Sequence, residues 1–82
     1  MALSPNPAAK FVSLNFSLLQ IADVSFKVFS TEGKNVLSWN ANAVSMGQHL
    51  EPIDVSSLAD GNYVYRFEAD AEVSSGKLSV VR

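Results

Sequence analysis

The strongest constraint on the fold is an alternation of apolar and polar residues with a period of two. It is clearest in "LADGNYVYRFEAD" (58–70), where Tyr63, Tyr65 and Phe67 alternate with valine, arginine and glutamate. Successive side chains of a β-strand point to opposite faces of a sheet, whereas an amphipathic helix repeats its apolar residues every three or four positions. The same alternation recurs in "FVSLNFSL" and "ADVSFKVF". The pattern therefore predicts strands with one buried and one solvated face.

Turn signals separate these segments. Gly33 lies in "STEGK", where a hairpin commonly needs a positive φ, and Gly47 and Gly61 lie in "SMGQ" and "ADGN". The "SSGK" at 74–77 is interpreted as a further turn. Pro52 cannot donate a hydrogen bond to a neighbouring strand, so its own strand is expected at a sheet edge or at a bulge.

Short strands at this spacing predict an all-β fold, an immunoglobulin-like antiparallel β-sandwich of about seven strands. Residues 1–9 are expected to be an extended lead-in, and residues 10–82 a single domain. In that domain, Leu58-x-x-Gly61-x-Tyr63 resembles the corner at which a tyrosine hydroxyl bonds to backbone a few residues upstream. The predicted strands are 10–19, 22–30, 34–40, 48–55, 62–70 and 76–82, with a further short one near 42–46 or 71–74.

Composition excludes several classes of function. The chain has 82 residues, a net charge of −2 and six scattered basic residues, so it lacks the concentrated positive charge of a nucleic-acid-binding surface. It has no cysteine, which removes disulfides and thiolate metal sites. The start of the sequence lacks the basic and apolar regions of a signal peptide, so any export signal is expected on a larger precursor.

Residues with reactive or ligand-binding side chains are few. His49 is the one histidine, and no paired nucleophile and orienting carboxylate accompany it in an interpretable pattern, so we expect no enzyme and no cofactor. The acidic and amide residues Asp54, Asp60 and Asn62 do not follow the spacing of a calcium-binding loop and favour turns. Trp39 suits either the core of the sandwich, which is favoured, or a platform on which a sugar stacks.

Four stretches follow one another along the chain: "LSPNPA" (3–8), "VSFKVFSTEGKNV" (24–36), "IDVSSLADGNYVYRFEA" (53–69) and "GKLSVVR" (76–82). Taken together, they resemble the C-terminal sorting domain of proteins exported by the type IX secretion system of Bacteroidetes-type bacteria. In that family a Pro-Asn-Pro lead-in precedes a β-sandwich, a Gly-Lys hairpin follows the second strand, and a short basic and apolar strand closes the chain.

The resemblance implies an address label at the end of a larger, N-terminally fused cargo protein. The cargo would cross the periplasm and meet the type IX translocon of the outer membrane through this label. A sortase-like signal peptidase would then remove the label, and the cargo would be secreted or held at the cell surface. The resemblance implies neither a nucleic acid nor a small-molecule substrate. The alternatives are an immunoglobulin-like adhesion or carbohydrate-binding module, and the immunoglobulin-like domain of flagellar hook-capping proteins.

The closing strand is the expected contact with the translocon. A terminal strand with an open backbone edge could add to a partner's sheet, and the same edge could support a homodimer. Ser79 departs from the family pattern, which more often has an apolar residue there. The expected recognition residues are Lys77, Leu78, Ser79, Val80, Val81 and Arg82. The residues expected to hold the family's fold are Pro5, Asn6, Pro7, Gly33, Lys34, Leu58, Gly61 and Tyr63.

Overall fold

The computed structural model describes residues 1–70 and 72–81, and within this part of the chain all regular structure is β-strand. The same residues include no helix that is long and apolar enough to cross a membrane. The strands are β1 (Ala2–Ser4), β2 (Phe11–Leu18), β3 (Ala22–Ser30), β4 (Asn35–Val44), β5 (Gly47–Asp54), β6 (Gly61–Ala69) and β7 (Glu72–Val80).

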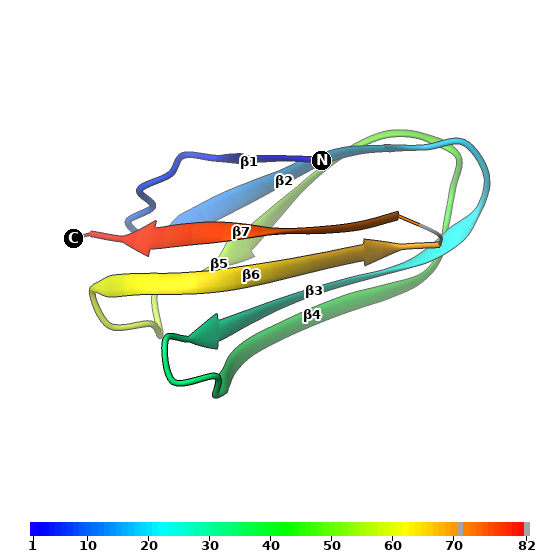
Figure 1. Cartoon of the computed structure of the whole chain (residues 1–82). Helices are drawn as coiled ribbons and strands as arrows, with labels where there is room; N and C mark the ends of the chain where they lie inside the picture. Colours follow the sequence, from blue (N-terminus) through cyan, green and yellow to red (C-terminus); the bar gives the residue numbers. More distant parts are fainter. Residues whose placement is uncertain (71, 82) are drawn as a thin grey trace.

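The strands form two antiparallel sheets that pack face to face. One sheet has the order β1-β2-β5 and the other the order β4-β3-β6-β7, and Figure 1 shows the second sheet in front of β2 and β5. Because β2 pairs with β5 while β3 pairs with β6, the connections cross between the sheets, as in immunoglobulin-like sandwiches. The predicted antiparallel sandwich of about seven strands is confirmed.

The core consists of the inward-facing positions of the alternating segments. Phe16 of β2 and Phe67 of β6 meet across the two sheets, with ring centroids 5.2 Å apart. Phe26 of β3 stacks on Tyr65 of β6 at 5.9 Å. No polar side chain is buried among the described residues, so packing of apolar surface holds the two sheets together. The largest fully buried side chains are Phe26, Phe67, Leu14, Leu78, Val12, Val24, Val28, Val55 and Val80.

One turn prediction is wrong. The segment 74–77 is not a turn but the middle of β7, and Gly76 pairs with Tyr65 of β6. A Cβ atom at Gly76 would lie 2.8 Å from the Tyr65 hydroxyl oxygen, so this glycine allows the tyrosine ring to lie across the strand. The change of direction comes earlier, at Asp70, whose φ is 56°.

Other local predictions are confirmed. Gly33 has a φ of 87° in the hairpin between β3 and β4, and Pro52 lies in β5, which is an edge strand.

Some strand bounds differ from the prediction. The third predicted strand extends beyond residue 40 to Val44, and the last one begins at Glu72. The lead-in contains a strand that the pattern did not predict: β1 pairs with β2, with Leu3 opposite Leu14.

Candidate docking surface

The closing strand β7 forms one edge of the four-stranded sheet, and its side chains divide between core and solvent. Leu78 and Val80 are fully buried opposite β6. Lys77 is exposed, Ser79 is half-buried, and the side chain of Val81 is 57% exposed. Of the expected recognition residues, two are therefore core residues, and Arg82 lies outside the described residues. The side chains open to a partner are mainly those of Lys77 and Val81.

The lead-in runs along the outer edge of β7. The Asn6 side chain donates from Nδ2 to the carbonyl of Lys77 at 2.9 Å, and its Oδ1 accepts from the N–H of Ser79 at 3.1 Å. Ala8 then forms a parallel bridge with Val80: its N–H donates to the Ser79 carbonyl and its carbonyl accepts from Val81, both at 2.8 Å. Figure 1 shows the lead-in and the C-terminal end of β7 at the same end of the sandwich.

The expectation of an open backbone edge at the closing strand is therefore wrong between Lys77 and Val81. In an antiparallel ladder, alternate residues turn both of their backbone groups away from the paired strand. On β7 these outward groups include the Lys77 carbonyl and both groups of Ser79, and the lead-in takes all three of them. A partner can add a strand at this position only if the lead-in leaves.

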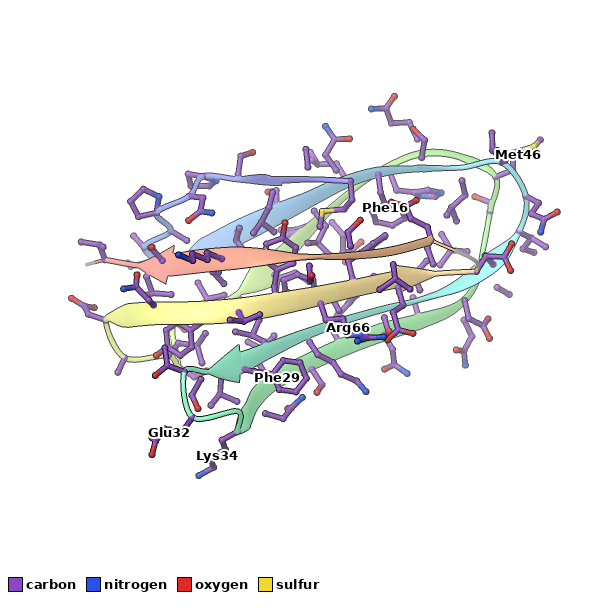
Figure 2. The ribbon with its side chains drawn as sticks, viewed as in Figure 1. Phe16, Phe29, Glu32, Lys34, Met46 and Arg66 are labelled. Atoms are coloured by element: carbon purple, nitrogen blue, oxygen red, sulfur yellow. The ribbon has the colours of Figure 1, made fainter. Side chains whose placement is uncertain are left out.

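The remaining motif residues hold turns. In the β3–β4 hairpin, Ser30 donates its N–H to the Lys34 carbonyl at 2.8 Å, and its carbonyl accepts from Gly33 at 2.9 Å. The Lys34 side chain points away from the hairpin into solvent (Figure 2). Gly33 and Lys34 thus take part in the backbone hydrogen bonds that close this hairpin.

The tyrosine corner is present as expected. The Tyr63 hydroxyl donates to the carbonyl of Ala59 at 2.6 Å, and the half-buried ring packs against the core. Leu58 is buried within the loop, and Gly61 begins β6 opposite Val80. The corner thus fixes the start of β6 directly beside the end of β7.

Comparison with known families bears out the resemblance seen in the sequence. A family model described as "Secretion system C-terminal sorting domain" matches residues 2–81, which includes both the lead-in and the closing strand. The chain belongs to this family, the C-terminal sorting domains of type IX secretion. A search of curated proteins and a search of solved structures gave no match.

Family membership sets the broad role of the sorting domain. Such domains are C-terminal signals of cargo proteins, and the cargo is secreted or displayed at the cell surface. The family is defined by sorting rather than by a reaction, which suggests a domain without catalytic activity.

The two side chains that suggested other functions are engaged with the body of the sorting domain. Trp39 lies on the core-facing side of β4 opposite Phe26, where it is half-buried and packs against the core. The ring of His49 stacks on Phe16 with centroids 5.4 Å apart, and its Nε2 lies 2.7 Å from the carbonyl oxygen of Ser45. The arrangement gives Trp39 a packing role and leaves little of its ring free as a platform.

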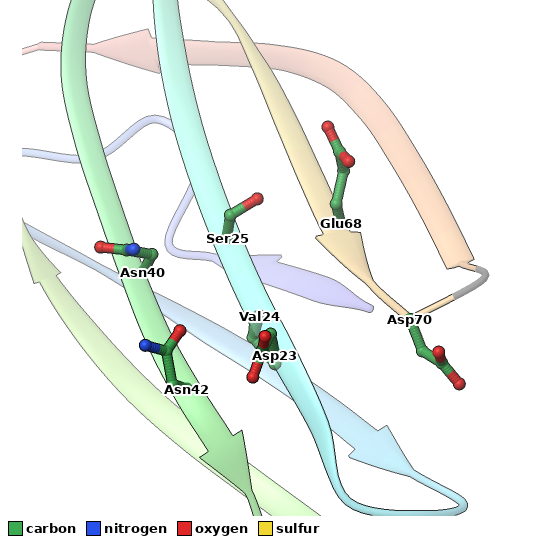
Figure 3. Close-up of a pocket in the computed structure, with 7 residues that line it drawn as sticks. All are labelled: Asp23, Val24, Ser25, Asn40, Asn42, Glu68 and Asp70. Atoms are coloured by element: carbon green, nitrogen blue, oxygen red, sulfur yellow. The ribbon is translucent and has the colours of Figure 1, made fainter.

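The four-stranded sheet has a recess of about 380 Å³ where β3 begins and β6 ends (Figure 3). Three carboxylates line this recess. Asp23 accepts from the N–H of Ala43 at 2.9 Å, Asp70 from Gln20 at 2.7 Å, and Glu68 from Arg66 at 2.7 Å. Each carboxylate thus has a structural partner.

The residues considered for calcium also have structural partners. Asp54 accepts from the N–H of Ser56 at 2.8 Å, and Asn62 from the hydroxyl of Ser79 at 2.9 Å. In the described part of the chain, no three histidine, aspartate or glutamate side chains are placed to hold a metal ion.

The contacts of Asn6 and Ala8 are the feature of this surface that sequence reasoning missed. The "PNPA" motif could have served as a signal. The two prolines have no backbone N–H, so the side-chain amide of the asparagine between them is the group best placed to form hydrogen bonds with another segment. The partner strand lies at the far end of the sequence, so no local pattern could identify it.

Proposed function

We propose that this sorting domain delivers an N-terminally fused cargo to the outer-membrane translocon of the type IX system, and that residues 77–82 take part in the contact. The match of the family model over residues 2–81 carries the proposal. Solvent-exposed Lys77 and Val81 support it, since they lie next to the motif-bearing lead-in at one end of the sandwich. A short strand with exposed side chains at alternate positions is suited to selective recognition by a protein.

We further propose that a sortase-like peptidase cuts upstream of Ala2. A cut there would leave the pairing of β1 with β2 and the contacts of Asn6 and Ala8 intact. A cut between Ala8 and Phe11 would leave the segment that makes these contacts without a covalent link to the rest of the domain. A homodimer through β7 would have to use the part of the strand before Lys77, because the lead-in occupies the edge beyond it.

The proposal is tested by fusing residues 1–82 to the C-terminus of a periplasm-competent reporter in a host with this pathway. Because Leu78 and Val80 are buried, deletion of residues 77–82 would also damage the fold. The double substitution Lys77→Glu with Val81→Asp changes the exposed side chains alone. We expect surface delivery by the intact fusion, and a fall to the level of the unfused reporter in the double variant.

The matched control is Thr31→Glu, an exposed substitution at the tip of the β3–β4 hairpin. Thermal unfolding of each purified domain should show that all variants remain folded. Retention of the intact fusion in the periplasm would refute the proposed function. Normal delivery of the folded double variant would remove Lys77 and Val81 from the contact.

A further inference from the structure

The lead-in and the closing strand carry the first and last motifs of the chain, and the structure joins them into one surface. Four hydrogen bonds link Asn6 and Ala8 to the backbone between Lys77 and Val81. Two of them come from a side chain: the Asn6 amide offers one donor and one acceptor, as a peptide group does. The lead-in thus serves as a short surrogate strand on the edge of β7.

The exposed side chains of this surface come from both segments. Pro5 and Pro7 are exposed on the lead-in, and Lys77 and Val81 are exposed on the strand side. Ala8 is fully buried and therefore anchors the lead-in to the body of the domain. Among the described residues, Lys77 forms no ion pair, so its charge is available to a partner.

We propose that the docking surface of the domain is composite: a protein partner contacts the clamped lead-in and the closing strand together, as one folded face. The chemistry of the face defines the partner, which must offer a carboxylate to Lys77 and an apolar recess to Val81 and the proline rings. The proposal rests on the proposed function and adds the lead-in to its site.

The alternative is strand exchange, in which the partner replaces the lead-in on β7. Exchange would break four hydrogen bonds and expose Ala8, which is completely buried. Buried or paired backbone groups that lose their partners are costly unless new partners replace them. A clamped lead-in avoids this cost, so the observations favour docking with the lead-in in place.

A disulfide lock separates the two modes of docking. Ala8 and Val80 are bridge partners, and paired residues of neighbouring strands lie within the Cα separation that a disulfide spans. The chain has no other cysteine, so the double variant Ala8→Cys with Val80→Cys can form one intramolecular bond. We expect the locked domain to deliver the reporter as well as each single-cysteine variant. Delivery by both single variants but not by the locked domain would overturn the proposal in favour of strand exchange.

The second arm changes the exposed side of the lead-in without touching its bonds. Ala9 is exposed on the lead-in, next to the buried Ala8 that bridges to Val80. We expect Ala9→Glu to lower the delivered fraction of the reporter by roughly tenfold, the size of effect seen for a lost interface contact. The control is Leu19→Glu, at a residue that is 96% exposed. Leu19 belongs to the connection between β2 and β3, which lies at the end of the sandwich opposite the C-terminus (Figure 1). The Ala9→Glu and Leu19→Glu domains should both keep the unfolding temperature of the parent to within a few degrees.

The outcomes remain distinct from those that test the proposed function. If the intact fusion is not delivered, the proposed function fails. If the intact fusion is delivered and the folded Ala9→Glu domain is delivered equally well, the composite surface alone is wrong. The lead-in substitution therefore tests the composite surface even if the disulfide between positions 8 and 80 does not form.

Discussion

Replacing Phe67 by alanine should lower the free energy of unfolding by about 3–5 kcal/mol, the usual cost of deleting a fully buried aromatic ring. Phe67 has no exposed surface, and its ring meets Phe16 of the opposite sheet. The substitution removes apolar burial and one of the contacts between the two sheets. A domain of this size is stable by only about 5–15 kcal/mol, so a large share of its stability would be lost.

Urea unfolding of the purified domain measures this loss. The control is Val64→Ala on the same strand, because Val64 faces solvent and is 44% exposed. We expect the control to cost less than about 1 kcal/mol. If Phe67→Ala cost no more than Val64→Ala, the two sheets could not be packed as described.

Tyr63→Ala should cost about 3 kcal/mol, the lower end of the range for a large aromatic because the ring is half-buried. The substitution removes the packing of the ring against the core and the hydrogen bond to the Ala59 carbonyl. Tyr63→Phe keeps the ring and should lose only the hydrogen bond, about 1 kcal/mol.

Tyr65→Phe is the matched control for the hydroxyl. Tyr65 lies two residues further along β6 on the same face, and no hydrogen bond of its hydroxyl is found among the described residues. We expect this control to leave the free energy of unfolding almost unchanged. A loss below about 1 kcal/mol for Tyr63→Ala would mean that the corner does not hold β6 in place.

Period-two alternation predicted the strands best where a strand has neighbours on both sides. β3 and β6 are central, so their inward side chains, such as Phe26 and Phe67, are covered completely and the pattern is sharp. In the edge strand β5, two polar residues face inward and an apolar residue faces solvent. His49 and Glu51 pair with the inward residues of β2, while Leu50 faces solvent and is 67% exposed. These polar side chains can occupy inward-facing positions because β5 is an edge strand, so they stay partly exposed to water.

The features that the sequence did not predict depend on contacts distant in the chain. Gly76 has the local sequence of a turn, and only Tyr65 on the neighbouring strand shows why it belongs in a strand. β1 has three residues, too few for any period, and it forms because β2 offers an edge. Likewise, the clamp of Asn6 depends on β7, so its motif could be recognised without its physical role.

The claim on which the functional account depends is that the lead-in is bound to the closing strand in the free domain. Amide hydrogen exchange tests it most directly, because β7 contains its own controls. The N–H groups of Ser79 and Val81 are bonded to Asn6 and Ala8, whereas those of Ser75 and Lys77 face outward on the same edge without a partner among the described residues.

We expect slow exchange at Ser79 and Val81 and fast exchange at Ser75 and Lys77. In Asn6→Ala, the N–H of Ser79 should become fast while that of Val81 stays protected by the Ala8 carbonyl. If instead all four amides of the intact domain exchange equally fast, the lead-in does not cover β7, and the composite docking surface does not exist.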